Sequence, residues 1–81
     1  LIYPNPVGDA GLNLEVTSID DKEFDLRVYD DIGKLVHLGT YLAGAGTSTH
    51  TISTMDWASG TYFLHLRSEG KSIVKEVIRK R

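Results

Sequence analysis

Hydrophobic and polar residues alternate along several short stretches of the chain. In residues 12–16, Leu and Val alternate with Asn and Glu, and the same period of two recurs in 24–29 and 61–67. Alternation of this kind places successive side chains on opposite faces of a half-buried strand. Residues 47–53 are rich in Thr and Ile, whose β-branched side chains suit a pleated surface better than a helix. The pattern therefore predicts a strand in each of these stretches.

Residues typical of turns separate the predicted strands. The sequence Asp30-Asp31-Ile32-Gly33 combines Asp side chains, which accept bonds from nearby backbone amides, with a Gly that adopts positive φ freely. A further strand over 34–42 completes a hairpin with 24–29. Residues 55–60 have no clear period and predict a corner or one short helical turn. The remaining connections are expected at 17–23, 43–46 and 69–70.

The final segment fits two kinds of secondary structure. It contains four β-branched residues at spacings of one and four: Ile73, Val74, Val77 and Ile78. These spacings suit one face of a helix. Four β-branched residues that follow a hairpin turn instead favour a strand, which is the interpretation we adopt.

Six or seven short strands, with turns about every ten residues, predict an all-β fold, an Ig-like antiparallel β-sandwich. The 81 residues allow one domain, 1–81, with a modest core and no deep cleft between lobes. No Cys is present, which excludes disulfides, thiolate metal sites and Cys nucleophiles. No apolar run approaches the roughly 20 residues of a membrane-spanning helix. The chain begins at Leu1 rather than Met, which suggests excision from a longer protein.

The net charge of −2 conceals an uneven distribution of charge. Residues 71–81 contain five basic residues and one acid, whereas the first 70 residues contain four basic residues and ten acids. A basic end on an acidic body is suited to contact with an anionic partner. Lys and Arg on an edge strand also protect that strand from pairing with other chains. Charge alone leaves both interpretations open.

Metal and catalytic chemistry find little support in the sequence. His37, His50 and His65 are separated by 13 and 15 residues, so no HxH or HxxxH pair places two imidazoles on one face. No GxSxG nucleophile elbow occurs, and so small a domain offers little room for a catalytic cleft. We therefore expect no metal, no cofactor and no enzymatic activity.

Other ligands are equally poorly supported. The acids within 20–25 lack the ordered ligands, central Gly and terminal Glu of an EF-hand, so they indicate a solvated loop. An acidic body argues against binding of nucleic acid, whose phosphates it repels. Trp57, Tyr62 and Phe63 could form an aromatic platform for a sugar, although aromatic residues in so small a sandwich more often belong to the core.

Four motifs occur in series along the chain. They are YPNPV at 3–7, VYDDIGKLV at 28–36, GTYFL at 60–64 and IVKEVI at 73–78. In this order and spacing they resemble the type A C-terminal sorting domain of the type IX secretion system (Por secretion system) of Bacteroidetes. The resemblance covers essentially all 81 residues.

The resemblance implies a folded export signal at the end of a larger secreted protein. In such a protein the type IX translocon and its shuttle proteins recognise the domain in the periplasm. The domain then guides its N-terminal cargo across the outer membrane to the cell surface. A sortase-like protease commonly removes the domain and joins the cargo to an anionic lipopolysaccharide, with cleavage near or before Leu1. The domain is then a substrate of that protease and catalyses nothing itself.

Several residues match the motifs of the family by position. They are Tyr3, Pro4, Asn5 and Pro6 of the opening motif, Asp30 and Gly33 of an Asp-x-x-Gly turn, and Gly60 and Tyr62 of a Gly-x-Tyr motif. For these residues maintenance of the fold is favoured over direct contact, because Pro fixes φ, Gly permits turns and Tyr suits a core.

The basic residues of the last segment are expected to contact the translocon. Lys75 matches the Lys that the family carries in its last strand. The other expected contacts are Lys71, Arg79, Lys80 and Arg81. The reason for the expectation is that a charge is not needed to hold a core.

Two further functions stay open at this point. One is an accessory Ig-like module that binds carbohydrate through Trp57 and neighbouring aromatic residues, and the other is a spacer attached to a surface enzyme. Position in the precursor separates them from the first interpretation, because a sorting domain must lie at the extreme C-terminus.

Overall fold

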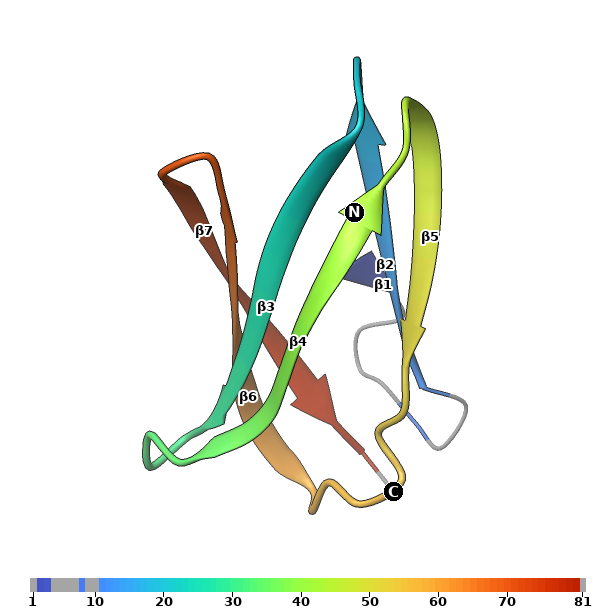
Figure 1. Ribbon diagram of the computed structural model, residues 1–81. Coiled ribbons are helices and arrows are strands. Elements are labelled where there is room, and N and C mark those ends of the chain that lie inside the picture. The colour runs from blue at the N-terminus through green and yellow to red at the C-terminus, as the bar shows by residue number, and fades with distance from the viewer. Residues whose placement is uncertain (1, 4–7, 9–10, 81) are drawn as a thin grey trace.

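In the part that the structure describes, the chain forms seven strands and no helix (Figure 1). The computed structural model describes residues 2–3, 8 and 11–80. The strands are β1 (Ile2–Tyr3), β2 (Leu12–Ser18), β3 (Lys22–Asp30), β4 (Leu35–Ala43), β5 (Gly46–Ile52), β6 (Gly60–Ser68) and β7 (Lys71–Arg79). Every pair of neighbouring strands is antiparallel. The expectation of an all-β fold is confirmed.

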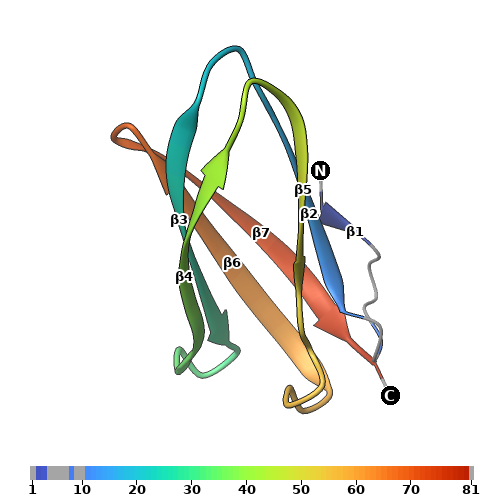
Figure 2. The same ribbon diagram turned by 45° about the vertical axis from the view of Figure 1, so that its right-hand side comes forward.

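The strands form two sheets that pack face to face (Figures 1 and 2). One sheet has the order β1-β2-β5 and the other has the order β4-β3-β6-β7. The chain crosses between the sheets after β2, after β4 and after β5. In the immunoglobulin-like sandwich this order corresponds to strands A, B and E in one sheet and C′, C, F and G in the other. The predicted Ig-like antiparallel β-sandwich is therefore confirmed.

Strand β7 settles the ambiguity of the final segment. It pairs with β6 along its whole length, from Lys71 opposite Ser68 to Arg79 opposite Gly60. The two turn residues before it, Glu69 and Gly70, both have positive φ, at 51° and 78°. Two successive residues of positive φ give the tight hairpin turn that matches the twist of paired strands. The helical interpretation of this segment is wrong, because the turn returns the chain directly alongside β6.

The core lies between the two sheets and uses the inward positions of the alternating stretches. Leu26 of β3 and Leu64 of β6 are completely buried. The other buried apolar side chains are Leu12, Leu14, Phe24, Val28, Ala43, Ile52, Trp57, Tyr62 and Val77. Full burial of an aliphatic side chain of this size stabilises the fold by about 1.5–3 kcal/mol. These side chains are what hold the two sheets together.

One side of the sandwich is open between β2 and β7. Strand β7 is one edge of its sheet, and among the described residues β1 pairs with β2 at Asn13 and Leu14. Among the described residues, 16–18 of β2 therefore have a strand partner only on the β5 side. The two views show the Arg79 end of β7 near the start of β2 and the Lys71 end diverging from it (Figures 1 and 2). The sheets are thus splayed along this side.

Candidate functional site

Strand β7 presents its lysines on the inner face of its sheet. Residues that face each other in an antiparallel pair share a face, and Lys75 lies opposite Leu64 while Lys71 lies opposite Ser68. Leu64 is completely buried, and Val77, two residues after Lys75, is 1% exposed. Both lysines are nevertheless exposed. They therefore project from the core-forming face at the part of β7 that the other sheet does not cover.

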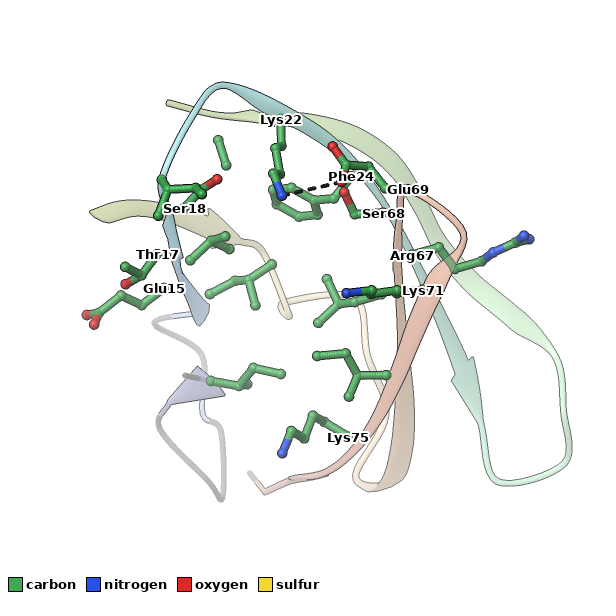
Figure 3. A pocket seen from close by; sticks show the side chains of 17 residues that line it. Glu15, Thr17, Ser18, Lys22, Phe24, Arg67, Ser68, Glu69, Lys71 and Lys75 are labelled. Atoms are coloured by element: carbon green, nitrogen blue, oxygen red, sulfur yellow. Dashed lines mark hydrogen bonds and ion pairs between the residues drawn. The ribbon is translucent and has the colours of Figure 1, made fainter. Parts of the chain in front are cut away.

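A groove of about 560 Å³ occupies this uncovered space between β2 and β7 (Figure 3). Its apolar lining includes Ile2, Leu14, Val16, Phe24, Ala43, Leu66 and Ile73. Lys71 and Lys75 extend from β7 toward the open groove in the close view (Figure 3). The groove is therefore lined mainly by apolar side chains, with the ammonium groups of Lys71 and Lys75 on its β7 side.

The basic groups around the groove differ in their partners. Lys22 Nζ lies 3.3 Å from Glu69 Oε2 and 3.9 Å from Asp20 Oδ1. Lys71 and Lys75 form no ion pair or side-chain hydrogen bond with the residues that the structure describes. Among the described basic residues of the lining, Lys71 and Lys75 are those that lack an ion-pair partner and also extend toward the groove, whereas the charged end of Arg67 points away from it (Figure 3).

Arg79, one of the expected contact residues, lies inside the fold. Its side chain is 1% exposed, Nε–H donates to the carbonyl of Thr54 at 3.0 Å, and Nη1 donates to the carbonyl of Lys80. The sequence did not lead us to expect a buried charge in this core, and the burial of Arg79 argues against direct contact with a partner. The signal for this is the period of two, which places Arg79 on the same inner face as Val77.

Arg79 connects three parts of the chain. Thr54, which accepts its hydrogen bond, is completely buried and donates through its own hydroxyl to the carbonyl of Gly8 at 2.6 Å. The end of β7 is thereby joined to the corner before β6, and through that corner to the segment before β2. Buried donors and acceptors that lose a partner cost about 1–3 kcal/mol each. The geometry favours a structural role for Arg79.

The other residues of the tail and of the opening motif divide into two groups. Lys80 is exposed, so its expected contact with the translocon stays a prediction. Tyr3 lies in β1, and its backbone pairs with that of Asn13 in β2. Pro4, Asn5 and Pro6 of the opening motif and Arg81 of the tail lie outside the described part of the chain.

Asp30 and Gly33 build the turn between β3 and β4. Asp30 Oδ1 accepts hydrogen bonds from the backbone N–H groups of Ile32 at 3.1 Å and Lys34 at 2.8 Å. The N–H of Gly33 donates to the carbonyl of Asp30 at 3.1 Å, and Gly33 has a φ of 87°. A Cβ at Gly33 would meet nothing within 4 Å, so the need for Gly there is conformational. The geometry favours a structural role for the Asp-x-x-Gly motif.

Replacing Asp30 with Ala should lower the free energy of unfolding by about 1–2 kcal/mol, because two backbone donors lose their acceptor. Urea unfolding followed by circular dichroism measures the change. The matched control is Asp30→Asn, which keeps a side-chain oxygen and should lose less than half as much. Equal losses in the two variants would show that the charge of Asp30, and not its hydrogen bonds, stabilises the turn.

Tyr62 closes one end of the core. Its hydroxyl donates to the carbonyl of Ala58 at 2.6 Å, and its ring centroid lies 4.7 Å from that of Trp57. A Tyr near the start of strand F that bonds to the backbone just before it is the tyrosine corner of Ig-like sandwiches. Gly60, which begins the same strand, has a φ of 151°. The Gly-x-Tyr motif therefore has a structural explanation.

The His residues lie among aromatic side chains and do not converge. His37 Nε2 lies 2.9 Å from the hydroxyl of Tyr41, whose ring centroid is 5.3 Å from that of His50. His65 packs against Tyr29 on the other face of the sheet. Burial lowers the pKa of His37. Within the described ranges no group of three His, Cys, Asp or Glu side chains could hold a metal ion.

Comparison with known proteins gives one match. Residues 1–80 match a protein family described as the secretion system C-terminal sorting domain. Neither the curated proteins nor the solved structures gave a match. Among the described residues there is no helix with the length and apolar character needed to span a membrane. The family match covers all four motifs of the sequence and every described residue.

Proposed function

Because the chain belongs to the family of type IX secretion system C-terminal sorting domains, we propose that 1–81 is one sorting module at the C-terminus of a longer exported protein. A sorting domain of this kind interacts with the type IX secretion machinery, carries an N-terminal cargo and directs export to the cell surface or beyond. The family is a family of sorting signals and not of enzymes. The observation that carries the proposal is the match over residues 1–80.

The folded sandwich is the form in which the periplasmic machinery and its shuttle proteins meet the signal. A sortase-like protease removes the domain after export, so the domain is a substrate in that step. The proposal is supported by the apolar packing that joins both sheets, because a signal that is recognised through its folded surface requires a stable fold. It involves no cofactor, and the acidic body of the chain disfavours nucleic acid.

The lysines of β7 are the proposed contacts with the translocon. Lys71 and Lys75 are exposed, and no described residue neutralises either of them. Lys80 and Arg81 are also proposed as contacts. Arg79 is not included among the proposed contacts, because its guanidinium is buried.

A cargo fused to residues 1–81 should reach the surface of a type IX-competent cell, and Lys75→Ala should reduce that export. Surface protease accessibility of the cargo measures the effect. The stability of the domain should change by less than about 0.5 kcal/mol, because an exposed charge contributes little to folding. Deletion of residues 71–81 cannot replace the Lys75→Ala variant in this test, because it removes the whole of β7 from the larger sheet.

The matched control is Lys34→Ala, which removes an exposed Lys from the turn at the far end of β3 and should leave export unchanged. Normal export of a Lys71→Ala/Lys75→Ala double variant would contradict the assignment of the contact. Unfolding of the Lys75→Ala variant would show instead that this Lys has a structural role.

The carbohydrate-binding alternative loses its main residue. Trp57 is 6% exposed and packs on Tyr62, so it offers no open platform to a sugar. The expectation that Trp57 and Tyr62 belong to the core is confirmed. A spacer function is separated from sorting by the export assay, because a spacer does not carry a fused cargo across the outer membrane.

A further inference from the structure

We propose that the groove between β2 and β7 binds an extended acidic segment of a partner protein, which adds to β7 as a further strand. The inference deepens the proposed function, because it gives the chemistry of a segment that would recognise this domain. It rests on that function only for the partner's place in secretion, and the binding itself is testable without export.

The backbone along the groove supports a peptide as the occupant. From Lys71 to Lys75, β7 has β6 as its single strand partner among the residues that the structure describes. Facing it across the groove, 16–18 of β2 likewise have only β5. A free strand edge presents a row of backbone donors and acceptors that another extended chain can pair with. An apolar chain such as a lipid tail supplies no such groups.

The side chains of β7 set the pattern that the segment must carry. Lys71, Ile73 and Lys75 alternate on the groove face, and Ile73 is 56% exposed in the groove lining. Residues four apart on a strand are about 13 Å apart, and the side chains of an added antiparallel strand pair directly with them. The complementary segment has an acidic residue, an apolar residue two positions later and a second acidic residue two positions after that.

The charges of the groove also favour a negatively charged segment. Lys71 and Lys75 have no acidic partner among the described residues, whereas the carboxylate of Glu69 is engaged by Lys22. The charged ends of Glu15 and Arg67 point away from the groove (Figure 3). An acidic segment along β7 would therefore meet two ammonium groups that no carboxylate of the described residues neutralises.

A second copy of this chain does not provide the required segment. Only one pair of acidic residues in the sequence is four residues apart, Asp21 and Asp25, and Glu23 rather than an apolar residue lies between them. Pairing of β7 with β7 of another copy would bring lysines near lysines. Residues 1–81 of a second copy are therefore not the proposed partner segment.

Inward-pointing lysines on an edge strand also act as protection against aggregation. Protection alone predicts that every added strand is rejected. Selective binding predicts that an acidic strand of the right spacing is accepted while neutral and basic strands are rejected. The two interpretations thus differ in the response to an acidic peptide.

The test is calorimetric titration of the 81-residue chain with a synthetic peptide of about nine residues. The peptide alternates Thr and Val and carries two glutamates four positions apart that flank one Val. The control peptide has the same composition with the glutamates three positions apart, so that they lie on opposite faces of a strand. We expect the first peptide to bind at least about tenfold more tightly than the second. Amide hydrogen exchange of residues 71–75 should slow in the complex.

Charge-reversal variants locate the site. Lys71→Glu and Lys75→Glu should each weaken binding about tenfold, whereas Lys34→Glu should leave it unchanged. Circular dichroism checks that each variant is folded. If Lys75→Glu is not folded, Lys75→Gln replaces it in the test, and this variant should weaken binding less than the charge reversal.

Several outcomes would overturn the inference. They are equal binding of the two peptides, unchanged binding in both reversal variants, a concentration-dependent dimer that fills the groove, or binding to phosphatidylglycerol vesicles in place of the peptide. Loss of peptide binding in Lys75→Glu with normal export would uphold the peptide site and reject its part in sorting. Failure of the fused wild-type domain to direct export, with peptide binding intact, would reject the proposed function alone.

Discussion

Replacing Tyr62 with Ala should lower the free energy of unfolding by about 3–5 kcal/mol. The variant loses a ring that is 5% exposed, its packing against Trp57, and the hydrogen bond to the carbonyl of Ala58. Domains of this size have a total stability of roughly 4–12 kcal/mol, at about 0.05–0.15 kcal/mol per residue. The change therefore removes a large share of the stability. Urea unfolding followed by circular dichroism or Trp57 fluorescence measures it.

The Tyr62→Phe variant separates the two contributions of this side chain. It keeps the ring and loses the hydroxyl that bonds to the corner, so it should cost about 1–2 kcal/mol. A loss below about 1 kcal/mol in Tyr62→Ala would be inconsistent with the burial of the ring. Identical losses in the two variants would mean that the hydrogen bond, and not the core contact, carries the whole effect.

Replacing Arg79 with Ala should lower the free energy of unfolding by about 2–4 kcal/mol, because the carbonyl of Thr54 loses one donor, keeping the N–H of Trp57, and the side chain leaves a cavity. The buried position and the bonds to Thr54 and Lys80 support this expectation. Export of a fused cargo should fall in parallel with stability. Thermal unfolding and the surface accessibility of the cargo, measured on the same variant, test both parts.

Two companion variants make the interpretation of Arg79 specific. Lys80→Ala removes an exposed neighbouring charge and should change stability by less than about 0.5 kcal/mol. Arg79→Lys keeps the charge but cannot reproduce the fixed fork of guanidinium donors, so an intermediate loss is expected. If Arg79→Ala abolished export and left stability unchanged, Arg79 would be a contact residue and the structural assignment would be wrong.

The strands were predictable because their pairing and burial follow from alternation. In 24–29 and 61–67 every second residue is apolar, and these residues are the ones that β3 and β6 place in the core. The turn at Asp30 was predictable for a local reason, because its hydrogen bonds join residues within four positions of each other. The final segment was harder, because its apolar spacing suits a helix as well, and only the preceding turn decided between them.

The site was predictable only in part. Lys71, Lys75 and Arg79 share one face of β7, and alternation fixes that much. Alternation does not say how far the opposite sheet extends over that face. At Arg79 the corner at Thr54 covers the side chain, whereas at Lys71 the sheets have diverged and the same face opens into a groove.

The sequence by itself thus determined the strands, the tight turns, the family and the concentration of basic residues at the end of the chain, because these depend on local periodicity and on residue identity. The tertiary structure alone decided that Arg79 is buried, that Tyr62 forms a tyrosine corner, and that an apolar groove lies beside Lys71 and Lys75, which have no ion-pair partner among the described residues. Those features depend on contacts between segments far apart in the chain, and the splay of two sheets leaves no trace in the spacing of residues within one strand.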